Sequence, residues 1–202
     1  MSSTFDYEKT VELVRNALVE AGSTFREDKK NAYERAIKHE KDEKARWVLE
    51  TILENAEAAE RNHSPLCDDT GIPHLVLEVG PDVFVTGRML DAIRGGIASG
   101  LRELPGRPMG IMGDDNRRID QSGGLDPDPA GVEPAPILLR TCRENVVRLH
   151  IMMFGGGPAI RAKTYRVFHK HNTRVVIDEI VKWATEGVAQ LGCSPCTLAV
   201  GI

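Results

Sequence analysis

The sequence predicts a mixed α/β fold, in which an all-helical N-terminal part precedes an α+β part with a mixed sheet. Residues 5–61 place apolar residues only at helical spacing, whereas short apolar runs typical of strands first occur after residue 62. Those runs alternate with amphipathic helical patterns, and a stretch rich in proline and glycine interrupts them at residues 104–136. We therefore divide the chain into residues 1–61 and residues 62–202.

Two helical patterns make up the N-terminal part. In the first, Val14 and Leu18 lie four residues apart, and Gly22 marks the end of the helix. The second covers residues 31–62, with a break expected near Glu40–Lys44, and places Trp47 on its apolar stripe. We expect this tryptophan to be buried in the core, because large apolar side chains at helical spacing usually face it.

Strands and helices alternate after residue 62. The run HLVLEVG is predicted as a strand, and a helix follows its N-cap Thr86. This helix places Leu90, Ile93, Ile97 and Leu101 on one side, and its Gly95 and Gly96 indicate close packing. The runs ILLRTC and NVVRLHIMMF are predicted as a hairpin joined by REN. After the polar turn FHKHN comes an amphipathic helix whose apolar side, with Trp183, is expected to be buried. The final TLAVGI is predicted as a strand.

Composition and charge exclude several classes of function. The 202 residues carry 26 basic and 30 acidic side chains, a net charge of −4 and no basic block, so no nucleic-acid partner is expected. No run of about 18 apolar residues occurs, so we expect no membrane span. The N-terminus, MSSTFDYEKT, lacks the apolar stretch of a secretory signal. We therefore expect a cytoplasmic protein.

The stretch SPLCDDTGIPH places Cys67 directly before Asp68 and Asp69. Two carboxylates raise the pKa of a neighbouring thiol and make it a poor nucleophile. A bound cation reverses this effect, because it favours both the thiolate and the ionised carboxylates. The motif therefore indicates a metal centre.

The other cysteines leave several interpretations open. Disulfides are rare in the cytoplasm, so Cys193 and Cys196, in the motif CSPC, are metal ligands, a redox pair or buried thiols. A single C-x-x-C is a weak zinc signal. Cys142 lies in a β-rich run, where a buried thiol is expected.

Three consecutive glycines, Gly155, Gly156 and Gly157, end the second β-rich run. Consecutive glycines let a backbone approach a ligand closely and offer it N–H groups. The motif is not a phosphate-binding P-loop, because no G-K-[ST] follows it. It is either a ligand-binding turn or a tight structural turn.

The order of these motifs resembles the alpha region of the iron–sulfur hydro-lyases, the family of class I fumarate hydratase and L(+)-tartrate dehydratase. The resemblance covers residues 45–202 and is carried by PLCDDTG, GGG and GCSPC before VGI. The corresponding family motifs are CQDTG, GGG, and GCPP or ACPP before VGIG. The resemblance implies reversible hydration or dehydration of a C4 dicarboxylate, such as fumarate, malate or tartrate.

The resemblance also implies roles for individual residues. Cys67 and Cys193 would be two of three thiolates that hold a [4Fe–4S] cluster, whose open iron would act as a Lewis acid. Asp69 would be the general acid and base. Contacts to the substrate would come from six further residues: Asp68, Thr70, Arg107, Gly155, Gly156 and Gly157.

Partners follow from the resemblance as well. A beta subunit or a C-terminal beta domain would complete the active site, and two alpha regions would form a dimer. The third thiolate of the family lies downstream, so we expect this alpha region to be truncated at its C-terminus, unless Cys196 serves instead.

Two departures from the family pattern keep alternatives open. Asp68 stands where the family has glutamine, and PAIRAK follows the glycines where fumarate hydratases have SEN. One alternative is a non-catalytic alpha-like module that binds a partner or a small ligand without a cluster. Another is a domain stabilised by zinc on Cys193 and Cys196.

Overall fold

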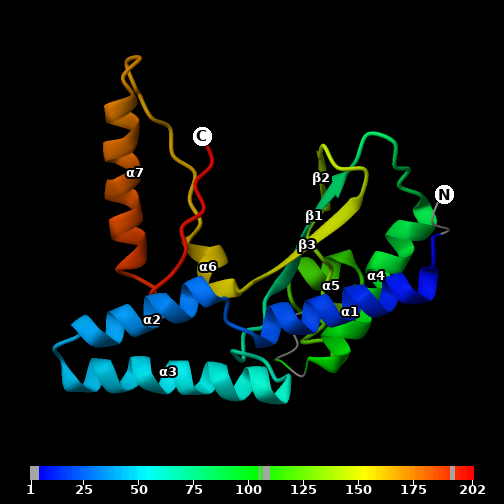
Figure 1. Cartoon of the computed structure of the whole chain (residues 1–202), viewed down its shortest axis with the longest axis horizontal. Coiled ribbons are helices and arrows are strands. Elements are labelled where there is room, and N and C mark those ends of the chain that lie inside the picture. Colours follow the sequence, from blue (N-terminus) through cyan, green and yellow to red (C-terminus); the bar gives the residue numbers. More distant parts are fainter. Residues whose placement is uncertain (1–4, 105, 107–109, 192–193) are drawn as a thin grey trace. The chain divides into compact units, whose positions relative to one another are not determined.

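The computed structural model describes residues 5–104, 106, 110–191 and 194–202. Three helices come first, and strands and helices then alternate, which confirms the predicted fold class (Figure 1). The elements are α1 (Tyr7–Ser23), α2 (Glu27–His39), α3 (Glu43–Asn62), β1 (Ile72–Val79), α4 (Gly87–Glu103), α5 (Asp115–Ile119), the 3-10 helix η1 (Pro129–Gly131), β2 (Leu138–Thr141), β3 (Val147–Phe154), α6 (Gly156–Arg161) and α7 (Thr173–Val188).

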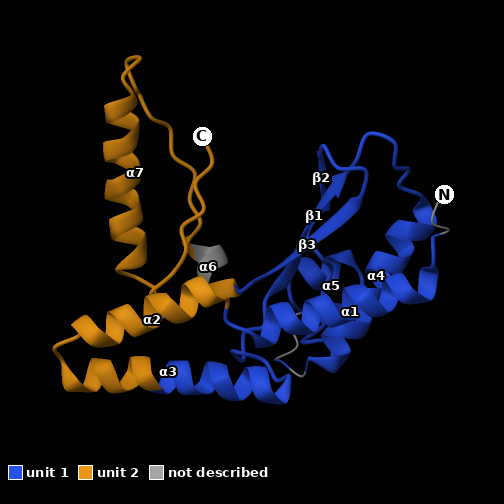
Figure 2. Cartoon of the chain, in the orientation of Figure 1, with its two compact units in different colours: residues 1–25, 51–155 blue, residues 26–50, 156–202 orange. Residues whose placement is uncertain are grey.

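The chain forms two compact units (Figure 2). The first contains Met1–Phe25 and Thr51–Gly155, and the second contains Arg26–Glu50 and Gly156–Ile202. The first unit holds α1, α4 and the sheet, whereas the second holds α2, α6 and α7. The division at residue 61, made on composition, stays a prediction.

The sheet is mixed and has the strand order β2-β1-β3. β1 runs parallel to β2, with Val76 opposite Leu138, and antiparallel to β3, with Ile72 opposite Phe154. Side chains alternate between the two faces of a strand, and this alternation is visible in the burial of β1. One face of the sheet therefore covers the core and the other is exposed.

The predicted hairpin between β2 and β3 is wrong, because β1 lies between the two strands. The loop after β2 crosses the end of β1 instead: Cys142 N donates to Val79 O, and Gly80 N donates to Val146 O. A Cβ on Gly80 would lie 2.7 Å from Asn145 Cα, so only glycine leaves room for this crossing. Local β patterns identify strands, but they do not show which strands are neighbours.

The hydrophobic core of the first unit lies between the sheet and the helices α1 and α4. Thr86 caps α4 as predicted, because its Oγ1 accepts a hydrogen bond from Met89 N. The predicted apolar stripe of α1 is buried at Val14 and Leu18, and that of α4 is buried at Ile93, Ile97 and Leu101. The buried core residues are Val14, Leu18, Val19, Leu75, Leu77, Ile93, Ile97, Leu101, Leu104 and Val132.

Glycine allows α4 to approach α1 closely, as the sequence predicted. A Cβ on Gly96 would lie 2.6 Å from Val14 Cβ and 2.7 Å from Val11 O. A Cβ on the neighbouring Gly95 would lie 3.6 Å from the nearest atom, which is ordinary van der Waals contact. The close approach therefore depends on Gly96 and not on Gly95.

This difference predicts opposite effects for two adjacent substitutions. Gly96→Ala is expected to destabilise the protein by about 1–3 kcal/mol, because the new methyl overlaps α1. Gly95→Ala is expected to be neutral or to stabilise by up to about 1 kcal/mol, because alanine favours helix. Urea denaturation of both variants measures the free energies of unfolding. Equal effects would show that α1 does not restrict Gly96.

Several predictions of burial and structure are wrong. Trp47 is 63% exposed, because α3 buries the side that carries Ala56, nine residues or two and a half turns away. None of the described side chains of α7 is fully buried. Cys142 is half-buried, with its Sγ 3.4 Å from Glu144 O. Residues 197–202 form no strand in the described structure.

Candidate functional site

Pairing of β1 with β3 brings two of the predicted motifs together. Ile72, the first residue of β1, lies opposite Phe154, the last residue of β3. The segment CDDTG directly precedes β1, and the glycines directly follow β3. Residues about 85 positions apart in sequence therefore meet at one end of the sheet, because antiparallel pairing places the start of one strand beside the end of the other.

Gly71 allows the segment CDDTG to lie directly against the end of β3. Its φ is +88°, a conformation that glycine adopts readily and other residues rarely do. A Cβ at this position would lie 2.6 Å from Phe154 C and 2.7 Å from Gly155 N. The glycine of CDDTG is therefore required by both its backbone conformation and its contact with β3.

Asp69 also lies close to the end of β3, beside Gly155. Its Oδ2 is 3.1 Å from the position that a Cβ on Gly155 would occupy, and its Oδ1 is buried. The residue as a whole is half-buried. The carboxylate thus lies beside the first of the three glycines.

The loop that carries Cys67 is anchored on its N-terminal side. Leu66 N donates to Gly22 O at 3.0 Å, and Leu66 O accepts a hydrogen bond from Asn55 Nδ2 at 3.0 Å. Cys67 and Asp68 follow this anchor and are exposed. The thiol is therefore presented at the surface two residues before Asp69.

Of the other predicted site residues, the structure describes the positions of Thr70, Gly156 and Gly157. Thr70 lies against Gly106, where a Cβ would be 2.7 Å from Thr70 Oγ1. Gly156 and Gly157 begin α6, in the second unit. Arg107 and Cys193 lie outside the described residues.

A cavity beside the motif was not predicted from the sequence. It has a volume of about 170 Å³, and Ile72, Ile111, Arg118 and Glu133 are among its lining residues. Arg118 and Glu133 come from the proline- and glycine-rich stretch 104–136. The length of that stretch was a signal of function, since long loops in compact domains often carry it, but it pointed to no particular residue.

A cluster of charged side chains lies at the opposite end of β1. Arg148 Nη1 and His150 Nε2 lie 2.7 and 3.3 Å from the same oxygen, Glu78 Oε2. The hydrogen bond from Arg148, and to a smaller extent the one from His150, lowers the pKa of the Glu78 carboxyl below its ordinary value. Since Glu78 lies near Val79 and not near Ile72, this cluster does not belong to the candidate site.

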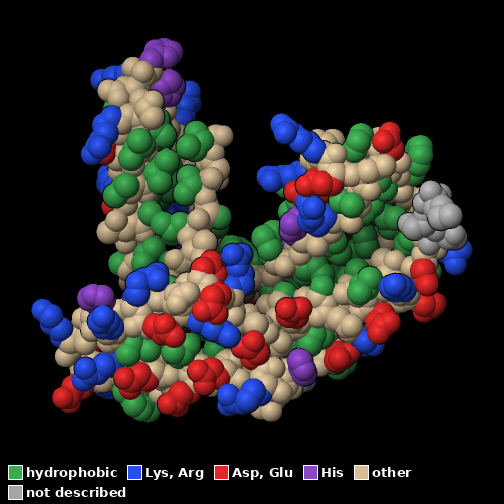
Figure 3. Space-filling view, viewed as in Figure 1, with side chains coloured by type: hydrophobic (Ala, Val, Ile, Leu, Met, Phe, Trp, Pro, Cys, Tyr) green, Lys and Arg blue, Asp and Glu red, His purple; other side chains and the backbone are tan. Residues whose placement is uncertain are grey.

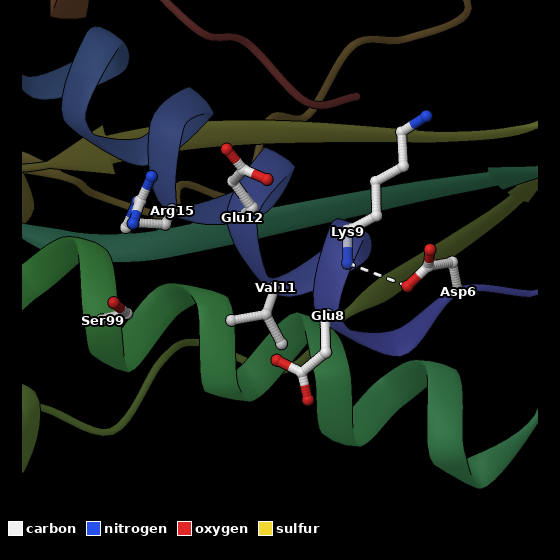
Figure 4. A pocket seen from close by; sticks show the side chains of 7 residues that line it. All are labelled: Asp6, Glu8, Lys9, Val11, Glu12, Arg15 and Ser99. Atoms are coloured by element: carbon white, nitrogen blue, oxygen red, sulfur yellow. Dashed lines mark hydrogen bonds between the residues drawn. The ribbon is translucent and has the colours of Figure 1, made fainter.

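A larger hollow of about 580 Å³ lies along α1 and α4 (Figure 4). Acidic and basic side chains of the first turns of α1 line it together, and Ser99 of α4 lies at one end. Asp6 Oδ1 there accepts the backbone N–H of Lys9 at 3.1 Å and caps the helix. None of the predicted site residues that the structure describes lines this hollow.

The residues described include one of the predicted cluster ligands, Cys67. No group of three or more His, Cys, Asp or Glu side chains within this described part is arranged to hold a metal ion. An exposed thiol is nevertheless the donor type that iron–sulfur clusters require. The donor chemistry at Cys67 thus fits such a group, although its second predicted ligand, Cys193, is not described.

The sequence model of the fumarate hydratase (Fumerase) family matches residues 11–202. The chain belongs to this family. The match includes both cysteine motifs and the glycine motif, so it confirms the resemblance on which the sequence prediction rested.

A curated protein of Methanocaldococcus jannaschii is also similar. It is named "Putative L(+)-tartrate dehydratase subunit alpha" and is 37% identical over 100 residues. The match covers 48% of this chain and 34% of the relative, so it spans about a third of the relative's length. Separately, none of the described helices is both long and apolar enough for a membrane span.

Proposed function

We propose that this chain is the alpha region of an iron–sulfur hydro-lyase that reversibly hydrates or dehydrates a C4 dicarboxylate, fumarate and malate or tartrate. The observation that carries the proposal is the position of Asp69 beside Gly155, where β1 and β3 meet. This arrangement combines a half-buried carboxylate with backbone N–H groups at the turn. Membership of the fumarate hydratase family supports the same reaction.

Each predicted residue has a role in this proposal. Asp69 transfers the proton at the carbon next to the departing hydroxyl group. Backbone N–H groups of the glycine turn orient a carboxylate of the substrate, and Arg107 binds a carboxylate with its planar guanidinium. Asp68 and Thr70 flank Asp69 in sequence and contact the substrate beside it.

Cys67 and Cys193 would hold a [4Fe–4S] cluster. When bound, the cluster would supply a Lewis acid for the substrate's hydroxyl group. The exposure of the Cys67 thiol supports its role as a ligand, since a fully buried thiol would be inaccessible to the cluster. The chain's own part is to present this thiol two residues from the proton-transferring Asp69.

Partners are proposed on the same basis. The name of the relative describes an alpha subunit, which supports a beta subunit or beta domain that completes the site. We propose that the alpha regions also form a dimer in the cytoplasm. Because the match spans a third of the relative, the substrate and the partner of the whole protein belong to this proposal.

Anaerobic reconstitution with iron and sulfide tests the ligand assignment. Cys67→Ala is expected to lower bound iron and acid-labile sulfide to background, with loss of the visible absorption of the cluster. Cys142→Ala is the matched control, because Cys142 lies after β2, next to the opposite end of β1. Its cluster content is expected to equal that of the parent chain.

Two outcomes would contradict this proposal. Equal iron in the Cys67→Ala variant would remove Cys67 from the ligand set. Absence of a cluster in the parent chain, alone and together with a beta partner, would favour the non-catalytic alpha-like module.

A further inference from the structure

Two exposed surfaces of this chain carry opposite charges. The acidic face lies on α3 and comprises Glu43, Trp47, Glu50, Glu54 and Glu57. The basic segment comprises residues 161–174, which include the last residue of α6 and the first two of α7. Each surface also presents a large aromatic side chain, so each has the composition of a binding surface.

The acidic face is continuous along one side of its helix. Its five residues are separated by steps of four, three, four and three, which place them on the same side of α3. All five are exposed, and Trp47 lies among the four carboxylates. Glu57 pairs with Arg61 one turn further along α3, at 3.8 Å, whereas Glu50 and Glu54 are like charges four residues apart, a spacing that weakens a helix.

The basic segment, RAKTYRVFHKHNTR, contains five Arg or Lys residues, two histidines and no acidic residue. Its Phe168 is 75% exposed, and the guanidinium of Arg166 lies 5.4 Å from the centre of that ring. Tyr165 stacks on Trp183 of α7 at 3.9 Å between ring centres, which holds the segment against the helix. Figure 3 shows Lys, Arg and His side chains gathered at this end of α7.

We propose that the acidic face of one copy of this chain binds the basic segment of a second copy. The charges are complementary, and Trp47 and Phe168 supply apolar anchors of the type that dominate protein interfaces. A twofold axis would form the contact twice in each dimer. The net charge of −4 favours a second copy over nucleic acid as the occupant of the basic segment. This inference names surfaces for the proposed dimer and does not depend on catalytic activity.

Sedimentation velocity of the intact chain measures the association. We expect a dimer that weakens at least about ten-fold between roughly 0.05 M and 0.5 M NaCl, because salt screens exposed charges. The emission of Trp47 is expected to shift to shorter wavelength as the dimer forms, and Trp47→Phe identifies its share of the signal.

Charge reversal tests which surfaces meet. Glu50→Lys with Glu54→Lys, and separately Lys163→Glu with Lys170→Glu, are each expected to weaken self-association at least about ten-fold. An equimolar mixture of the two double variants is expected to recover the dimer, because opposite charges then face each other again. Lys9→Glu with Arg94→Glu is the control with the same size of charge change on α1 and α4, and it is expected to leave association unchanged.

Several results would overturn the inference. A parent chain that stays monomeric at about 100 µM in low salt has no such interface. A dimer that survives both double reversals uses other surfaces. Failure of the mixture to recover association excludes the pairing of these two surfaces. Nucleic acid is the partner of the basic segment instead if the parent chain binds a labelled oligonucleotide tightly and the Lys163→Glu, Lys170→Glu variant does not. Circular dichroism of each variant identifies any that fail to fold.

Discussion

Asp69→Asn is expected to lower turnover by about 100-fold to 10,000-fold, because an amide cannot take up and return the proton that the proposed reaction moves. The amide has the same shape as the carboxylate, so the contact with Gly155 is expected to persist. Hydration of fumarate and dehydration of malate and tartrate, measured with the beta partner present, give the rates. The iron content is expected to stay that of the parent chain.

Asp68→Asn is the matched control for this experiment. Asp68 is the neighbouring carboxylate and is exposed, whereas Asp69 is half-buried beside the glycine turn. We expect Asp68→Asn to change the Michaelis constant more than the turnover number, because its proposed role is contact with the substrate. Turnover near the parent rate in Asp69→Asn would remove Asp69 from the mechanism, whatever the effect at position 68.

Gly71→Ala is expected to destabilise the protein by about 3 kcal/mol or more, because two costs add. The new Cβ would lie 2.6 Å from Phe154 C, and that strand is fixed by its pairing with β1. In addition, the backbone at φ +88° is unfavourable for any residue with a side chain. Urea denaturation measures the loss in the free energy of unfolding.

Gly124→Ala separates the two costs. Gly124 also has a positive φ, +70°, but a Cβ there would meet no atom of the described residues within 4 Å. This variant is expected to lose only the conformational cost, about 1–2 kcal/mol. Equal losses at the two positions would mean that Gly71 does not hold the CDDTG segment against the end of β3, and the geometry of the candidate site would need another explanation.

Much of the architecture follows from local sequence pattern. The stripe of Ile93, Ile97 and Leu101 predicted the buried side of α4, and Thr86 predicted its start. These predictions are confirmed because helix periodicity and capping depend on residues within a few positions of one another. The motifs CDDTG and GGG were likewise readable from the sequence, and the family match confirms their resemblance.

Long-range contacts decided the rest. The sequence alone predicted the helices α1, α4 and α7, the three strands of the sheet and the residue types of the candidate site. Only the tertiary structure decided that β1 separates β2 from β3, which corrected the hairpin and brought Gly71 and Gly155 together. The exposure of the Trp47 side chain was also decided at this level, because helical spacing defines an apolar stripe but not whether a neighbouring element covers it. Strand order and burial depend on residues far apart in the chain, and no local pattern encodes which of them meet.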